Sequence, residues 1–140
     1  MSYMSSAARW SHDTKLVAEP LSAVRARAFV CKHLLEHQLP LLVDKVQLVA
    51  SELATNAVVH AQTAFTLTLS EVGDTVVLAL RDDSPSLPSP RSPQPTDTAG
   101  RGLRVVQAIS LDWGISTERS GSKTVWASFG TRGRQMSEST

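Results

Sequence analysis

Apolar and polar positions follow a helical rhythm through the first third of the chain. A weakly alternating stretch at 12–19 suggests an edge strand, and Pro20 stands where a first helical turn tolerates proline. Five apolar residues then recur at spacings of three and four: Leu21, Val24, Ala28, Cys31 and Leu35. This spacing predicts an amphipathic helix that buries this stripe and ends at Leu39-Pro40.

A second helix is predicted over roughly 41–61. Its apolar residues fall on one side at helical periodicity: Leu42, Val46, Val49, Ala50, Leu53 and Ala57. A continuous apolar face of this kind is typical of a helix that lies against a core.

The periodicity then changes from helical to alternating. Apolar side chains at 65, 67 and 69 and at 76, 78 and 80 alternate with other residues around a turn at Gly73-Asp74, which predicts an antiparallel hairpin with one buried face. Two more strands are expected near 111–117 and 123–129, after a short helix at 103–109.

These elements predict an α+β domain. Helices on one face of a mostly antiparallel mixed sheet form a two-layer α/β sandwich. We expect the domain to span 12–130, with a flexible N-terminus at 1–11 and a disordered tail at 131–140.

Composition narrows the class of protein. The 140 residues carry a net charge of only +1, so neither nucleic acid nor an anionic membrane is an expected partner. No apolar leader or membrane-spanning stretch is visible, and the single cysteine, Cys31, fits a reducing cytoplasm as a small core residue. We therefore expect a soluble cytoplasmic protein.

Candidate chemistry begins on the second helix. Glu52, Asn56 and His60 are spaced four residues apart, which places them on one polar stripe beside the apolar face. Such a stripe on its own is better explained as a solvated helix edge.

Two further features are equally weak when taken alone. Asp82 ends a core strand, where an aspartate usually serves a turn. Gly100-Arg101-Gly102-Leu103 is expected to form a small-residue loop that opens a helix, where bare N–H groups bind anions. Between them, 84–99 holds five of the seven prolines, and so long a loop suggests a function.

The order of these pieces resembles the ATP-binding boxes of the GHKL (Bergerat-fold) superfamily, and within it the anti-sigma-factor serine kinases and their actinobacterial relatives. The resemblance covers roughly 12–130. It is carried by SELATNAVVHA (51–61), LRDDSP (80–85), GRGLRVVQAIS (100–110), DWG (112–114) and KTVWASF (123–129).

The resemblance implies a role for each candidate residue. Asn56 would coordinate Mg²⁺ on the phosphates of ATP, and Glu52 would act as the catalytic base towards the attacking hydroxyl. Asp82 would accept a hydrogen bond from adenine, supported by Thr124 through water. Ser84 stands where a glycine is common in the first glycine box, and 84–99 would form a lid.

At the second glycine box, the resemblance implies backbone amides that meet the phosphates. The ATP-binding residues there would be Gly100, Arg101, Gly102 and Leu103. An amide oxygen suits Mg²⁺, and phosphoryl transfer depends mainly on positioning and charge neutralisation, so the chemistry is consistent with these roles.

Three functions remain open. The resemblance favours an ATP-dependent protein serine/threonine kinase that phosphorylates an anti-anti-sigma (STAS-type) partner, binds a sigma factor and regulates transcription by partner switching. The alternative is a nucleotide-gated binding module without phosphoryl transfer; a homodimer fits either. With no second domain or phospho-accepting histidine helix in 140 residues, we expect a stand-alone domain.

The third function is a zinc peptidase. His33-Leu34-Leu35-Glu36-His37 matches the H-x-x-E-H string of inverted zinc peptidases. This interpretation is disfavoured because the helix ends by Pro40 and no distal helix offers an obvious third ligand. A P-loop at 121–124 is rejected, since Lys123 is not adjacent to a glycine and precedes a strand.

Overall fold

The computed structural model describes residues 8–82 and 98–131, with the backbone alone at 98–103. Along the chain the elements are β1 (Trp10–Leu16), α2 (Leu21–Glu36), a 3-10 turn η1 (Pro40–Leu42), α3 (Val43–Asn56), a π-helical turn η2 (Ala57–Ala61), β2 (Phe65–Val72), β3 (Thr75–Asp82), α4 (Thr98–Ile109), β4 (Asp112–Thr117) and β5 (Lys123–Gly130).

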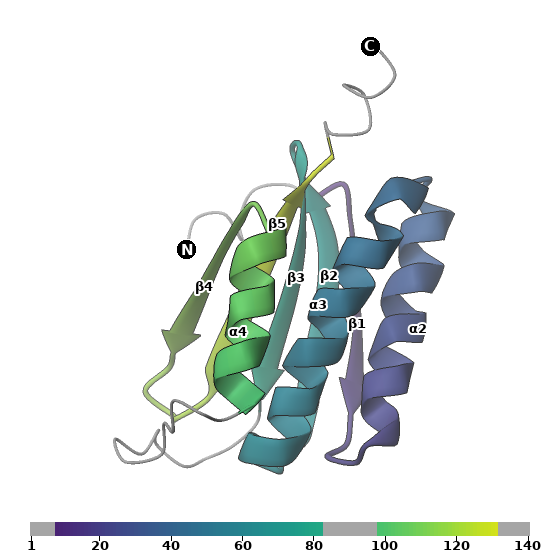
Figure 1. The fold of residues 1–140 in the computed structure, drawn as a ribbon. Helices are drawn as coiled ribbons and strands as arrows, with labels where there is room; N and C mark the ends of the chain where they lie inside the picture. Colours follow the sequence, from purple (N-terminus) through teal and green to yellow (C-terminus); the bar gives the residue numbers. More distant parts are fainter. Residues whose placement is uncertain (1–7, 83–97, 132–140) are drawn as a thin grey trace.

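The described strands form one sheet in the order β1-β2-β3-β5-β4, and every neighbouring pair is antiparallel. The three α-helices lie side by side over one face of this sheet, with α3 in the middle (Figure 1). The predicted α+β two-layer sandwich is therefore confirmed.

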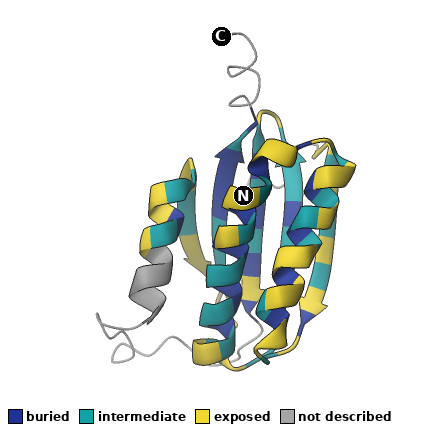
Figure 2. Ribbon diagram, turned by 45° about the vertical axis from the view of Figure 1, so that its right-hand side comes forward, coloured by how far each residue is buried: buried dark blue, intermediate teal, exposed yellow. Residues whose placement is uncertain are grey.

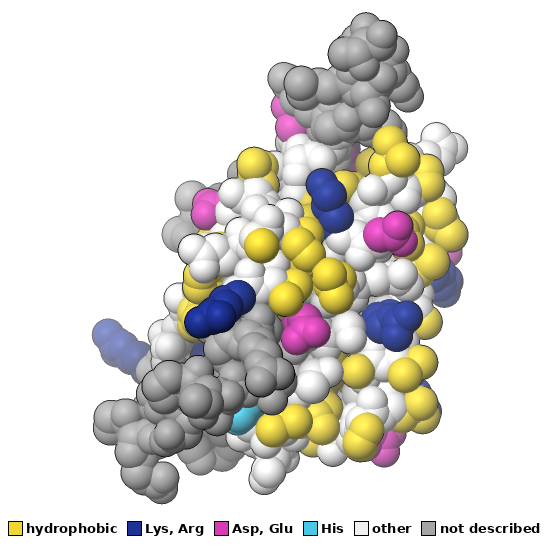
Figure 3. All heavy atoms as spheres, in the orientation of Figure 1, with side chains coloured by type: hydrophobic (Ala, Val, Ile, Leu, Met, Phe, Trp, Pro, Cys, Tyr) yellow, Lys and Arg dark blue, Asp and Glu magenta, His cyan; other side chains and the backbone are white. Residues whose placement is uncertain are grey.

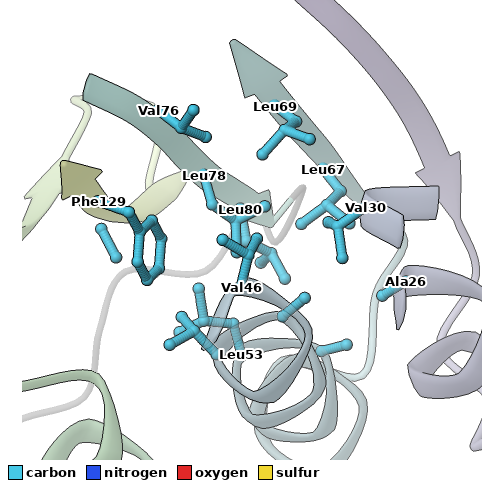
Figure 4. Packing of buried hydrophobic residues seen from close by; sticks show 14 of the residues in the cluster. Ala26, Val30, Val46, Leu53, Leu67, Leu69, Val76, Leu78, Leu80 and Phe129 are labelled. Atoms are coloured by element: carbon cyan, nitrogen blue, oxygen red, sulfur yellow. The ribbon is translucent and has the colours of Figure 1, made fainter. Parts of the chain in front are cut away.

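The core lies between the sheet and the helices. Alternate residues of β2 and β3 point at the helical layer, because successive side chains of a strand face opposite sides. They meet Val46 and Leu53 of α3 and Val30 of α2 (Figure 4). Buried residues accordingly occupy the middle strands and the inner helix surfaces, and exposed ones the outer helix surfaces (Figure 2).

The buried face of α2 differs from the predicted one. The stripe Leu21, Val24, Ala28, Cys31 and Leu35 lies on the outer side of the helix, where Leu21, Val24 and Leu35 are 49%, 54% and 52% exposed and Cys31 is half-buried. The residues that face the core are Ser22, Ala26, Val30 and Leu34.

Two apolar stripes therefore run along opposite sides of α2, and tertiary packing selects between them. Small side chains at Ser22 and Ala26 allow the helix to approach the sheet closely. The Ser22 hydroxyl donates to the Val17 carbonyl at 2.7 Å, so its burial leaves no donor unpaired. The unselected stripe contributes to the apolar side chains that are exposed on the helical face of the molecule (Figure 3).

Three predicted boundaries also shift. The first strand begins at Trp10 rather than at 12, and α4 begins at Thr98, five residues before the predicted start at 103. Thr131, assigned to the disordered tail, is buried, and its N–H and hydroxyl donate to the Asp74 carbonyl at 2.8 and 3.0 Å. No helix in the described ranges combines the length and apolar character needed to cross a membrane.

Gly114 on β4 meets a steric requirement of the sheet. A Cβ atom at this position would lie 2.8 Å from the indole of Trp126 on the neighbouring strand β5. The indole therefore occupies the space that any other side chain would need, which explains the glycine in the DWG stretch.

Adjacent leucines test the corrected face of α2. Leu34→Ala removes a fully buried side chain and should lower the free energy of unfolding by about 2–5 kcal/mol. Leu35→Ala, on the outer stripe, should change it by no more than about 0.5 kcal/mol. Urea unfolding of the two variants measures both values, and equal losses would contradict the assignment.

Candidate functional site

Three segments that are distant in sequence meet at one end of the molecule. The C-terminal end of α3, the last residues of β3 and the first turn of α4 lie together at the lower end in Figure 1. Helix α3 packs against both α4 and β3. Phe65 pairs with Asp82, so the connection between η2 and β2 reaches the same end.

Helix α3 places Glu52 and Asn56 one turn apart at the rim of the core. Both residues are half-buried, and they flank Leu53 and Ala54, which are buried. His60, the third member of the predicted polar stripe, lies in the π-helical turn and is exposed. The structure therefore brings Glu52 and Asn56 together at the rim and leaves His60 outside.

The side-chain oxygen of Asn56 is the most informative atom of this region. Oδ1 is buried, yet it accepts no hydrogen bond within the described part of the chain. An unsatisfied buried acceptor costs about 1–3 kcal/mol, so native proteins rarely retain one without a reason. An amide oxygen is a hard, neutral ligand of the kind that Mg²⁺ accepts beside phosphates and water. The residue therefore fits the implied metal.

The backbone changes character directly after Asn56. Residues Ala57–Ala61 widen into a π-helical turn, which ends at Gln62 with a left-handed φ of 59°. The Gln62 N–H donates to the Ala57 carbonyl at 2.9 Å. Single π-helical turns within α-helices are frequent at functional sites.

Sequence reasoning missed Thr63, the second residue with a buried and unsatisfied side-chain oxygen in the described regions. Thr63 is two residues before Phe65, the partner of Asp82, so it belongs to the same end of the sheet. The one signal in the sequence is its place between a helix end and a core strand, a position that many loop residues share.

Asp82 is the last residue of β3 and is only 6% exposed. It continues the series of inward side chains Val76, Leu78 and Leu80, so its carboxylate lies on the helical side of the sheet. A buried carboxylate at the end of a strand is a strong hydrogen-bond acceptor with a fixed direction.

The strand register does not bring Thr124 to Asp82, contrary to its expected supporting role. Thr124 pairs with Arg81, whereas Asp82 pairs with Lys123. Paired residues share a face and the faces alternate, so Thr124 lies on the opposite side of the sheet from the Asp82 carboxylate. Lys123, which sequence reasoning did not select, is the β5 residue on the side of Asp82.

The glycine segment lies within a helix rather than before one. Gly100, Arg101, Gly102 and Leu103 belong to the first turns of α4. The N-terminus of α4 nevertheless lies at the same end of the molecule as Asn56, and a helix N-terminus offers unpaired N–H groups to anions (Figure 1). Ser84 and the predicted lid, apart from its last two residues, fall outside the described residues.

Comparison with known families gives one match. A family model described as a histidine kinase-like ATPase domain matches residues 16–129, a range that contains every candidate residue named above. No curated protein matches the chain.

The unsatisfied oxygen of Asn56 leads to a stability prediction for the nucleotide-free protein. Asn56→Ala should leave the free energy of unfolding unchanged, or raise it by up to about 1–3 kcal/mol, because the acceptor it removes has no partner in the part of the chain that the structure describes. Ser22→Ala is the matched control. It removes a bonded buried hydroxyl and should cost about 0.5–1.5 kcal/mol. Urea unfolding distinguishes the two, and a larger loss for Asn56→Ala than for Ser22→Ala would show that Asn56 is structural.

Proposed function

The chain belongs to the family of histidine kinase-like ATPase domains, and from that premise we propose that it is a Mg·ATP-dependent protein serine/threonine kinase of the anti-sigma-factor kind. The family supplies the coarse function, a GHKL-type ATP-binding domain. The observation that carries the finer proposal is the pair on α3: a carboxylate, Glu52, one helical turn before the unsatisfied oxygen of Asn56.

Asn56 is the residue that would hold the metal. Its Oδ1 has no hydrogen-bond partner among the described residues, and Mg²⁺ when bound would neutralise charge on the phosphates of the nucleotide. The N-terminal N–H groups of α4 would bind phosphate oxygens from the other side, since α3 and α4 pack against each other.

Glu52 would take the proton from the attacking serine or threonine hydroxyl. It is half-buried and shares the rim of α3 with Asn56, so it would lie on the phosphate side of the proposed site. In this chemistry the protein mainly positions the two oxygens and stabilises charge, and a single well-placed carboxylate suffices as the base.

Asp82 would select the base of the nucleotide. Its buried carboxylate accepts hydrogen bonds and cannot donate them, so it suits the exocyclic amino group of adenine and opposes the carbonyl oxygen that guanine carries in its place. Guanine would place a second acceptor opposite the carboxylate, and the repulsion between the two would disfavour it.

The proposed substrate is a STAS-type anti-anti-sigma protein, with a sigma factor as the second partner. Support comes from the stretches 51–61, 100–110 and 123–129, which resemble those of the anti-sigma-factor kinases. A nucleotide-gated binding module would need the same metal and adenine contacts. It would have no use for Glu52, and the position of this carboxylate therefore favours the kinase.

Two substitutions on α3 separate these functions. Glu52→Ala should bind Mg·ATP within a few-fold of the wild type and lose about 10²–10⁴-fold in the rate of phosphoryl transfer to a STAS protein. Asn56→Ala should weaken both, because the metal holds the phosphates as well as neutralising them. Transfer of labelled phosphate, measured beside nucleotide affinity, gives the two readings.

His60→Ala serves as the control, since this exposed residue lies just beyond the pair and should change neither quantity. Wild-type transfer rates in Glu52→Ala would remove the base assignment. A wild-type protein that binds ATP and grips a STAS partner without phosphorylating it would establish the binding module instead.

A further inference from the structure

A cluster of histidines lies at the junction of the edge strand β1 and the end of α2. His12 comes from β1, while His33 and Glu36 come from the last turn of α2. One potential ligand atom from each of the three lies within 4.8 Å of the others. We propose that His12, His33 and Glu36 form a binding site for a divalent transition metal ion, with Zn²⁺ as the preferred ion.

The ligand atoms are already close to one another. The Nδ1 atom of His33 lies 2.9 Å from Oε1 of Glu36, and their i, i+3 spacing places both on one side of the helix. The Nε2 atom of His12 lies 2.9 Å from Nε2 of His37, the residue that caps α2. Three potential ligands from two elements therefore surround one small region, and His37 contacts one of them, His12.

Ring packing holds these side chains in place. The His12 ring stacks on that of His33 with centroids 3.8 Å apart, and His37 stacks on Trp10 at 4.0 Å. Phe29 contacts the His33 ring edge-on at 4.8 Å. These contacts restrict the side chains in the metal-free protein. Since an imidazole nitrogen binds a metal in the plane of its ring, the stacked His12 and His33 rings must turn relative to one another to share one ion.

The burial of the ligands is graded. The His33 side chain is 13% exposed and that of Glu36 is 48% exposed, so the cluster is sheltered on the His33 side and open to solvent on the Glu36 side. Catalytic and exchangeable zinc sites commonly use three protein ligands and leave one position to water. The cluster has this form, with His37 beside it.

The chemistry of the ligands favours zinc over magnesium. Imidazole nitrogen with one carboxylate oxygen is a common zinc ligand set, whereas Mg²⁺ prefers oxygen ligands and retains most of its water.

This site is separate from the candidate nucleotide site. Trp10, beside His12, pairs with Glu71 at one end of β2, whereas Phe65 at the other end of β2 pairs with Asp82. The ligand set also differs from that of a zinc peptidase. Glu36 is bonded to His33 rather than free to act as a base, and the third ligand, expected on a distal helix, comes from a strand.

A metal ion at this site would link the edge strand β1 to helix α2. Among the described strands, β1 pairs with β2 alone, and an ion that bridges His12 to His33 and Glu36 would add a second attachment. Zn²⁺ that binds only the folded arrangement would stabilise the domain in proportion to its concentration over Kd.

Calorimetric titration of the full chain with ZnCl₂, after treatment with a chelator, tests the site. We expect one ion per chain and a higher Tm for the wild type in the presence of zinc. His12→Gln should bind zinc at least about tenfold more weakly and lose the rise in Tm. Loss of a residue that only supports a ligand already lowers metal affinity by about this factor, and loss of a ligand should lower it at least as much. His60→Gln, which removes the one histidine that is neither in the cluster nor beside it, should behave as the wild type.

Glu36→Gln provides a second variant with a largely exposed side chain, should His12→Gln fail to fold. It too should weaken zinc binding at least about tenfold. ATP affinity measured on the same samples should not change, which separates this site from the nucleotide site. Zinc affinity equal in the wild type, His12→Gln and Glu36→Gln, or a wild type that binds no zinc, would overturn the proposal.

Discussion

The burial of one face of α3 against the sheet determines where everything else lies. This helix contacts both neighbouring helices and the strands β3 and β5, and its residues Val46, Val49, Ala50 and Leu53 are at most 3% exposed. Once Leu53 is fixed in the core, helical geometry leaves Glu52 and Asn56 no place except the rim. The same packing buries Asn56 Oδ1 without giving it a partner within residues 8–82 and 104–131. The unsatisfied oxygen lowers the stability of the domain locally, and a ligand that binds it would offset this loss.

Local patterns were sufficient to predict most of the fold. Apolar and other residues alternate regularly in β2 and β3, and α3 has a single apolar face. In these elements the periodicity of apolar residues predicts the buried side chains. For α2 it did not, because Leu21 and Leu35 suggest one buried side and Val30 and Leu34 another. The choice between these two sides depends on the space between α2 and the sheet, which small residues such as Ala26 fit.

The site was less predictable because it depends on register and on contacts across the chain. Glu52 and Asn56 share a helix, so their spacing was readable from the sequence. Thr124 was expected beside Asp82, but it pairs with Arg81, one residue earlier in β3. This difference of one residue puts the Thr124 side chain on the opposite face of the sheet from Asp82. The contact between His12 and His37 joins residues 25 positions apart and two different elements, and no local pattern encodes it.

We propose that two side-chain groups mark a Mg·ATP site in this histidine kinase-like ATPase domain: the oxygen of Asn56, which has no partner among the described residues, and the buried carboxylate of Asp82. Titration calorimetry of the intact protein with ATP, and with GTP, in Mg²⁺ and in excess EDTA, tests it most directly. We expect one ATP per chain, much weaker binding of GTP, and loss of most of the ATP affinity in EDTA. Failure to bind ATP in Mg²⁺, or an ATP affinity in EDTA equal to that in Mg²⁺, would contradict the proposed site.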